Sequence, residues 1–545
     1  MHKPLPPQPS LEQLKKQAKS LLKEQQTANP EALSRIREHH PRLKNSPEKL
    51  HFALADAQLI IAREYGFETW SKLKAHVMTP EITKSFETTV KSIREAAGQG
   101  DLARLTSLLD AHPELIDEPG GPGVRTALHQ AVFGNSAEAV KLLLERGADP
   151  NLRCEGDNAY PLHFAVEKKK FPIIRLLIEH GADPVGEGDY HELGVIGWAT
   201  AWDYIDADKE IVSYLLAHGA RHNIFSAVAM GAVDAIRELV TRTPENLEQR
   251  MDMANRRRRP LHLAVAKKQP ESLTALLDLG ANLEAIDEAG FTALDQAAFN
   301  GETTMAQTLL DRGAKVRLPA AVALGRRREM ERLLARDPDC LKPGGRWGTL
   351  LVRASERSSG DVIETLIRAG ASVNVRDDPK TAVDSAWGYT ALHAAAFSGN
   401  LSAAEVLLKH GANVQMREEK WHGTPAGWAN YAGHTEVRDL ILREPVDIME
   451  AVENGLTERV ATILQEDPNA IDRPFHEYPI YPLYAEGWFT PLVFAVSLGQ
   501  TEMTQWLLEH DADSEIHSPE GRALYEIAIE KRHQRIAEML KPDAP

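Results

Sequence analysis

The sequence of 545 residues contains only two cysteines, Cys154 and Cys340, which lie too far apart to form a metal or redox motif. It also lacks any apolar run of about 18 residues, the length that a membrane-spanning helix needs. The first residues, MHKPLPPQPSLEQLKKQAKS, contain no apolar core of the signal-peptide type. These absences predict a soluble protein in a reducing, cytoplasmic setting, without contact to a membrane.

Sequence motifs of enzymes are equally absent. The chain has no Gly-x-Ser-x-Gly elbow, no phosphate-binding loop, no dinucleotide-binding glycine fingerprint and no His-Glu-x-x-His helix. Two His-Glu pairs, in YHELG and FHEYP, fall in different places of the repeat described below, and both lie in loops. We therefore predict no catalytic residue, no metal ligand and no cofactor.

The charge of the chain is mostly negative, with a formal net charge of −16. Residues 1–80 contain 13 Lys and Arg against 8 Asp and Glu, so they carry +5 and the rest of the chain carries −21. An acidic body repels nucleic-acid phosphates, so we predict no nucleic-acid partner.

What the sequence does contain is a repeat. TALHQAVFGNSAEAVKLLLERGADPN begins at Thr126, and TALHAAAFSGNLSAAEVLLKHGANV begins at Thr390. Each unit has a threonine cap, a short Ala-rich helix, a break that favours Gly or Asn, a second helix and a closing Gly-Ala-Asp or Gly-Ala-Asn. One such unit cannot bury its apolar face alone, so the pattern predicts an all-α solenoid of stacked units.

The phrases TALH, PLHLAV and LLERGADPN resemble those of ankyrin repeats, and the resemblance covers residues 86 to 542. It implies about 14 helix-turn-helix units joined by β-hairpin fingers. It also implies a concave groove, lined by fingers and first helices, that most often binds other proteins. In that family the histidines of the Thr-Pro-Leu-His phrase belong to an internal hydrogen-bonding pattern; here they are His129, His163, His262 and His393.

Constant offsets between landmarks indicate an internal duplication. Gly147 and Gly370 are 223 residues apart, and Trp198 and Trp428 are 230 apart. We therefore predict two seven-unit blocks, residues 86–317 and 318–545. Residues 1–85 do not follow the repeat and are predicted to form a small helical cap, similar to the basic leader of some bacterial ankyrin proteins.

Aromatic residues make up only 6% of the chain, so their positions are informative. Five stand just before the break between two helices, where the resemblance places groove-facing side chains: Phe133, Trp202, Phe299, Phe397 and Tyr431. Others fall in the fingers: Tyr190, Trp387, Tyr389, Tyr478, Tyr481, Tyr484 and Trp488. Either set could bind a partner or pack between units, whereas Trp198 and Trp428 are assigned to packing.

These features favour a non-catalytic scaffold that binds a protein or peptide in its groove and on its fingers. An alternative is an enzyme or small-ligand binder with a pocket enclosed between the two blocks. A third is a structural or oligomerising element. The sequence leaves the partner and the oligomeric state open.

Overall fold

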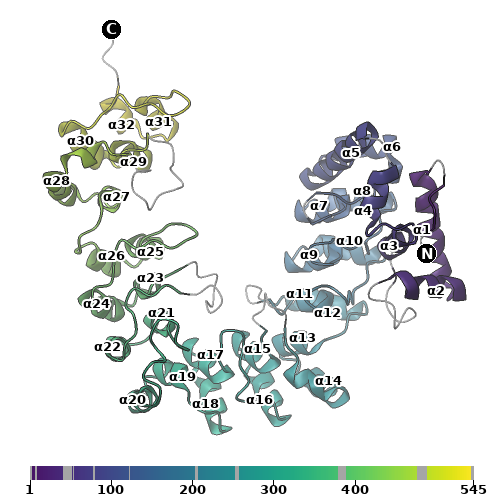
Figure 1. Cartoon of the computed structure of the whole chain (residues 1–545), viewed down its shortest axis with the longest axis horizontal. Coiled ribbons are helices and arrows are strands. Elements are labelled where there is room, and N and C mark those ends of the chain that lie inside the picture. The colour runs from purple at the N-terminus through teal and green to yellow at the C-terminus, as the bar shows by residue number, and fades with distance from the viewer. Residues whose placement is uncertain are drawn as a thin grey trace. The chain divides into compact units, whose positions relative to one another are not determined.

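The computed structural model describes residues 3–6, 9–40, 52, 54–77, 80–121, 123–202, 207–251, 257–377, 388–474 and 488–541 (Figure 1). Apart from isolated bridges, the regular structure in these ranges is helical, as the repeat predicts. The residues pack into two units, Met1–Asp287 and Glu288–Pro545. This division falls one helix pair before residue 318, where the duplication places the start of its second copy. The duplication itself stays a prediction.

Four helices precede the repeats: α1 (Leu11–Gln26), α2 (Pro30–His39), α3 (Leu54–Glu64) and α4 (Trp70–Val77). They enclose a small apolar core of their own, in which Leu14, Leu21, Ile36 and Ile60 are buried. These four helices thus pack together ahead of the repeats, and their role as a cap stays a prediction. The helix that follows it begins at Pro80 and crosses the boundary predicted at residue 85.

The repeat helices of the first unit are α5 (Pro80–Gln99), α6 (Leu102–Ala111), α7 (Ala127–Phe133), α8 (Ala137–Glu145), α9 (Pro161–Glu167), α10 (Phe171–Glu179), α11 (Gly194–Trp198), α12 (Lys209–Ala217), α13 (Ile224–Ala229), α14 (Val233–Arg242), α15 (Pro260–Ala266) and α16 (Pro270–Asp278). Two short 3-10 helices, η1 (Pro113–Leu115) and η2 (Pro244–Glu248), follow α6 and α14.

Those of the second unit are α17 (Ala293–Phe299), α18 (Thr303–Asp311), α19 (Leu318–Ala323), α20 (Arg327–Arg336), α21 (Leu350–Ser355), α22 (Gly360–Arg368), α23 (Ala391–Ser398), α24 (Leu401–Lys409), α25 (Pro425–Tyr431), α26 (Thr435–Ile441), α27 (Ile448–Glu453), α28 (Thr457–Glu466), α29 (Pro491–Leu498), α30 (Thr501–Glu509), α31 (Leu524–Glu530) and α32 (Gln534–Met539). The 3-10 helix η3 (Pro468–Ile471) follows α28.

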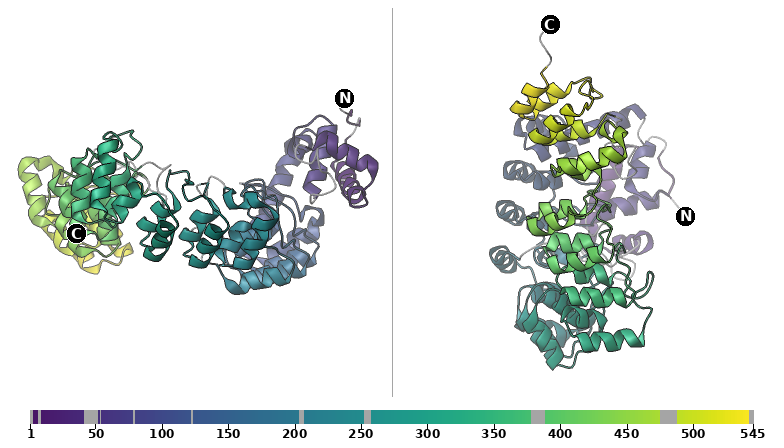
Figure 2. Two further views of the ribbon diagram at one scale, coloured as in Figure 1. Left: turned by 90° about the horizontal axis from the view of Figure 1, so that it is seen from below. Right: turned by 90° about the vertical axis from the view of Figure 1, so that its left-hand side faces the viewer.

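Within a unit the helices stack in two rows. In the second unit α21, α23 and α25 form one row, and their partners α22, α24 and α26 form the other (Figure 1; Figure 2, right). Small side chains allow this close stacking, since Ala391, Ala395 and Ala396 of α23 are fully buried. The core is therefore continuous along the stack, as expected where single repeats cannot bury their own apolar faces.

Local signals place the ends of these helices. The side chain of Thr390 accepts a hydrogen bond from the backbone N–H of His393 and so caps α23. The helix ends at Gly399, whose φ of 70° lies in the left-handed region that glycine tolerates best. Both features repeat along the chain, which is why helix positions follow from the sequence.

The histidines of the repeat phrase connect neighbouring repeats. Nδ1 of His393 lies 2.8 Å from the Thr390 hydroxyl, and its Nε2 lies 3.1 Å from the carbonyl oxygen of Gly423 in the next finger. Burial lowers the pKa of His393 to about 3, so the ring is neutral at physiological pH. His129 and His163 make the equivalent bonds to Ala159 and Gly186. For these three histidines the predicted internal bonding pattern is confirmed.

The fingers differ from the predicted β-hairpins. In the described residues they contain isolated antiparallel bridges, such as Gly120 with Arg125 and His517 with Ala523, and no extended strands. The Gly120–Arg125 bridge consists of two backbone hydrogen bonds of 3.1 and 3.2 Å. Such loops are too short to extend the ladder, so tight turns replace strands.

Two ion pairs join the cap to the first repeat. The Glu118 carboxylate, which is buried, lies 2.6 Å from Nζ of Lys15 in α1 and 2.8 Å from Nζ of Lys74 in α4. These cations hold the pKa of Glu118 below its usual value despite burial. The cap is thus attached at the loop that follows α6. Among the described residues, no helix is long and apolar enough to span a membrane.

Candidate functional site

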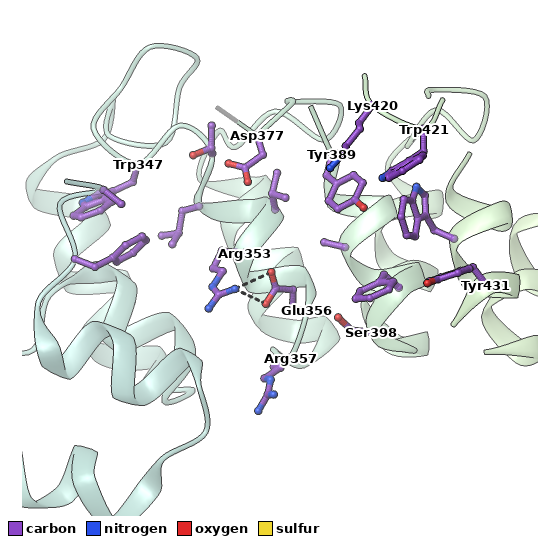
Figure 3. Close-up of a pocket in the computed structure, with 18 of the residues that line it drawn as sticks. Trp347, Arg353, Glu356, Arg357, Asp377, Tyr389, Ser398, Lys420, Trp421 and Tyr431 are labelled. Atoms are coloured by element: carbon purple, nitrogen blue, oxygen red, sulfur yellow. Dashed lines mark hydrogen bonds and ion pairs between the residues drawn. The ribbon is translucent and has the colours of Figure 1, made fainter. Parts of the chain in front are cut away.

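The candidate site is a cavity of about 530 Å³ in the second unit. Helices α21, α23 and α25 line it together with the loops that precede them (Figure 3). Its lining is rich in aromatic side chains: Phe291, Trp347, Tyr389, Phe397, Trp421, Trp428 and Tyr431. Trp347 lies at one end of the cavity, and Trp421 and Tyr431 lie at the other (Figure 3).

Trp428 is the centre of the aromatic group at one end. Its ring meets those of Tyr389, Phe397 and Tyr431 edge to face, at centroid distances of 5.3, 5.6 and 5.5 Å. This is a favoured geometry for aromatic pairs, because the positive edge of one ring meets the negative face of another. The indole nitrogen of Trp428 is buried without a hydrogen-bond partner in the described part of the chain. Trp428 therefore packs as predicted and also forms part of the cavity wall.

The charged residues of the cavity are mostly basic. Four cations, Arg346, Arg353, Arg357 and Lys420, line it with two carboxylates, Glu356 and Asp377. Arg353 donates to both carboxylate oxygens of Glu356, at 3.1 and 2.8 Å, and this ion pair stands in the middle of the cavity (Figure 3). The cavity thus has a net charge of +2, within a chain whose net charge is −16.

The second aromatic group, at Trp347, is contacted by two cations. The guanidinium carbons of Arg317 and Arg346 lie 5.1 and 5.2 Å from the Trp347 ring centroid. Phe291 packs beside the same ring, with centroids 5.8 Å apart. Cation–π contacts of this kind stabilise the ring and the cations beside it, and Arg346 lines the cavity next to Trp347.

Three of the five predicted groove aromatics are exposed. Tyr431 is 79% exposed, Phe397 is 46% exposed and Phe133 is 37% exposed. Tyr431 and Phe397 line the cavity of the second unit, and Phe133 lines a different cavity in the first unit. The structure therefore brings together only two of the five.

Trp202 and Phe299 are buried, which corrects their prediction as groove contacts. Helix α11 ends at Trp198, and the chain then turns so that the Trp202 ring packs on Trp198 at 5.3 Å and on His191 at 4.7 Å. The 230-residue offset aligns Trp202 with Ala432, one place beyond Tyr431. Trp202 stands four residues beyond the end of α11, so the turn of the chain after this short helix sets the direction of its ring.

Phe299 is covered by its neighbours for a different reason. Its ring packs edge to face on Phe291, with centroids 6.0 Å apart, and the guanidinium of Arg353 lies 5.6 Å above it. The long side chain of Arg353 shields a ring that its own helix position would leave open. Phe299 thus packs against Phe291 and Arg353, which both line the cavity.

The finger aromatics have mixed positions. Tyr190 is 49% exposed. Tyr389 is half-buried against Trp428, and burial raises its pKa to about 12, with the charge of Glu418 adding to the shift. Trp488 packs beside Phe489 on the core of the second unit. The other four finger aromatics, Trp387, Tyr478, Tyr481 and Tyr484, lie outside the described residues.

Several cavity residues were missed in the sequence. Trp421 is 66% exposed and lies at the same end of the cavity as Tyr431 (Figure 3). It stands in the finger sequence EEKWHG and was not among the predicted binding residues. Trp347, in GGRWGT, was missed in the same way. An aromatic residue next to a glycine turn in a finger was the signal available. Arg353 carried no such signal, because arginines are frequent on helix surfaces.

Titratable groups elsewhere do not form a metal centre in the described residues. The carboxyl of Glu450 in α27 is fully buried. Burial raises its pKa to about 8, and the nearby Asp447 adds to the shift, while a hydrogen bond from the Thr424 hydroxyl opposes it. Its remaining carboxyl oxygen has no partner among the described residues.

Comparison with protein families identifies the class of this chain. A model described as "Ankyrin repeats (3 copies)" matches residues 93–188, 198–320 and 351–449, more than half of the chain. The chain belongs to the ankyrin repeat family.

Curated relatives share only part of their length with it. The chain is 24% identical over 344 residues to the human "Transient receptor potential cation channel subfamily A member 1", covering 58% of this chain and 29% of that protein. It is 29% identical over 350 residues to the Caenorhabditis elegans "Ankyrin repeat and KH domain-containing protein mask-1", covering 61% of this chain and 13% of that one. It therefore spans less than a third of the length of either relative. Among solved structures, the human ASB11 ankyrin repeat domain is 26% identical with a TM-score of 0.29, covering 41% of this chain and 99% of that domain.

Proposed function

We propose that this protein is a non-catalytic binding scaffold and that a segment of a partner protein docks in the aromatic cavity of the second unit. Three exposed rings at one end of that cavity, those of Tyr431, Phe397 and Trp421, are the observation that carries the proposal. Grouped exposed aromatics usually mark binding surfaces, and rigid rings give much contact area for little lost entropy. Tyr389 lines the same cavity and is a candidate contact within this proposal, whereas Phe133 and Tyr190 belong to the first unit and stay separate predictions.

The charge of the cavity points to the chemistry of the partner segment. Four cations against two carboxylates attract an acidic segment, and the rings accept its apolar side chains. Charge complementarity of this kind steers association and fixes register. We therefore propose an acidic segment with interspersed apolar residues as the occupant.

The enzyme alternative has less support. Both oxygens of Glu356 that a general base would use accept hydrogen bonds from Arg353. We also propose a cytoplasmic location, because Cys154 and Cys340 are free thiols and such thiols persist in reducing compartments. The oligomeric state stays open.

The test is a matched pair of double variants in affinity capture, followed by titration with the purified captured protein. Phe397→Ala with Tyr431→Ala removes two exposed rings from the cavity. Leu102→Ala with Leu216→Ala removes two exposed apolar side chains from the second helices α6 and α12. We expect the first pair to weaken binding by about 100-fold, as for hot-spot residues, and the second to leave it unchanged. Equal binding by both pairs would contradict the assignment of the groove.

A further inference from the structure

The first unit contains a cavity of its own, of about 920 Å³, lined by α5, α7 and the loop of residues 119–124. One part of its wall is apolar and includes Phe86, Val90 and Phe133. Next to this apolar wall the cavity contains Arg94 of α5. This cavity is separate from the one proposed above to bind the partner segment.

Arg94 is a buried cation without a counter-ion. Its side chain belongs to a residue that is only 9% exposed, and among the described residues it makes no hydrogen bond or ion pair. Its Nε atom is sealed from solvent with no acceptor. Buried charges are normally paired, because the loss of hydration is costly. An unpaired arginine at a cavity wall therefore points to an absent anionic partner.

The loop is shaped to admit the guanidinium group. Gly121 has a φ of +65°, and a Cβ atom there would lie 2.7 and 2.8 Å from the two terminal nitrogens of Arg94. Any side chain at this position would displace them. The head group of Arg94 thus lies against the glycine loop that lines the cavity.

The other charges near this cavity already have partners. Lys74 pairs with Glu118 at 2.8 Å, and Lys91 pairs with Glu95 at 3.7 Å. Burial and repulsion by Arg125 lower the Arg94 pKa, and attraction by the Glu95 carboxylate opposes them. Glu95 already pairs with Lys91 and Glu87 at the rim is exposed, so in the described part of the cavity neither carboxylate forms a direct ion pair with the Arg94 guanidinium.

We propose that Arg94 binds the carboxylate of an acidic peptide segment, and that the wall of Phe86, Val90 and Phe133 takes an adjacent apolar side chain. The planar guanidinium matches a carboxylate with two parallel hydrogen bonds. The apolar wall favours a peptide over a fully polar anion such as inorganic phosphate. This inference concerns the first unit alone and does not depend on the proposed cavity of the second.

Isothermal titration calorimetry on the full chain tests this with two capped peptides, acetyl-Ala-Leu-Glu-Leu-Ala-amide and its twin with Gln in place of Glu. We expect the Glu peptide to bind about 10- to 100-fold more tightly than the Gln twin, as a charge-assisted bond should give. Arg94→Gln should abolish that difference, and Arg94→Lys should restore only part of it. Removal of an unpaired buried charge should not unfold the chain, which thermal unfolding of Arg94→Gln verifies.

The matched control is Arg237→Gln, which removes the same charge from α14, outside the cavity, where Arg237 pairs with Asp234 at 3.7 Å. It should bind the Glu peptide as the wild type does. Equal binding of both peptides to the wild type, or unchanged preference in Arg94→Gln, would overturn the proposal. Tighter binding of inorganic phosphate than of the Glu peptide would overturn it in favour of a phosphate site. The Phe397 and Tyr431 variants should behave as wild type here, which separates this test from that of the proposed function.

Discussion

The rings of Trp428 and Tyr431 meet edge to face, with centroids 5.5 Å apart and planes at 81°. They are three positions apart on α25, yet Tyr431 is 79% exposed while Trp428 is half-buried between Tyr389 and Phe397. One ring therefore holds the aromatic group together, and the other is presented to a ligand.

Replacement of these two rings should change the free energy of unfolding to very different extents. Tyr431→Ala should change the free energy of unfolding by less than about 0.5 kcal/mol, because its ring is already in water. Trp428→Ala should cost about 3 kcal/mol, because it leaves a cavity among three packed rings. Hydrogen exchange of α23 to α26 measures both locally, as a long repeat array need not unfold in one step. A large loss of protection in Tyr431→Ala would contradict its assignment as a presented ring.

Two break glycines in adjacent repeats offer a second comparison. Gly399 and Gly433 have φ values of 70° and 80°, so alanine is strained at both. A Cβ atom at Gly399 would also lie 2.6 Å from the His434 ring, whereas nothing lies within 4 Å at Gly433. Gly433→Ala should destabilise by about 1 kcal/mol, from backbone strain alone, and Gly399→Ala by about twice that. Denaturant titration measures the difference, and equal losses of unfolding free energy in the two variants would show that the His434 ring moves aside without cost.

The buried carboxyl of Glu450 should make stability fall as the pH rises. Its pKa is about 8 in the folded chain, against an ordinary value of 4.5 for glutamate, so between these pH values the folded state retains a proton that the unfolded state releases. Asp447 and Glu453 reinforce this, whereas the charge of Arg417 opposes it. Glu450→Gln should therefore be more stable than the wild type at about pH 8 by a few kcal/mol, and similar to it at about pH 4.5. Thermal unfolding across this range measures the difference, and parallel curves would contradict it.

Three buried histidines should make stability fall as the pH falls, the reverse of the effect of Glu450. The pKa of His129 is lowered to about 3, that of His163 to about 4 and that of His393 to about 3, mainly by burial. Below the ordinary histidine pKa of 6.5 the unfolded state binds protons that these folded sites do not bind, so stability falls as the pH falls. The cost at about pH 5 is on the order of 2 kcal/mol for each histidine.

His129→Gln provides the check on this acid effect. The variant should be less stable at neutral pH, since the bond to Ala159 is altered, but its stability should fall less steeply between about pH 6.5 and 5. Unfolding midpoints at several pH values give the slope. If the slope matches that of the wild type, His129 does not contribute to the acid sensitivity.

Short-range signals were the reliable part of the sequence. Thr390 and Gly399 delimit α23 because capping and left-handed backbone geometry depend on a few adjacent residues. The same is true of the repeat phrase that identifies the family. The fingers were less predictable: whether a turn such as residues 120–125 extends into a hairpin depends on how many backbone bonds its length allows.

The set of residues that lines the cavity could not be predicted from the sequence. Phe299 and Phe397 occupy equivalent places in their repeats, yet Arg353 covers the first ring and leaves the second open. Trp421 was not predicted because it stands in a finger whereas Tyr431 stands at the end of α25, and only the fold brings both to the same cavity. The unpaired state of Arg94 likewise depends on which carboxylates neighbouring helices bring near it.

The sequence alone determined the family, the helical repeats and the internal bonds of its histidines, because each depends on local spacing that recurs along the chain. Only the tertiary structure decided which aromatic rings are exposed and which charges remain uncompensated. A side chain's exposure depends on the residues that neighbouring repeats place over it and on where its helix ends: Tyr431 is the last residue of α25 and is exposed, whereas Trp202 lies four residues beyond the end of α11 and is buried.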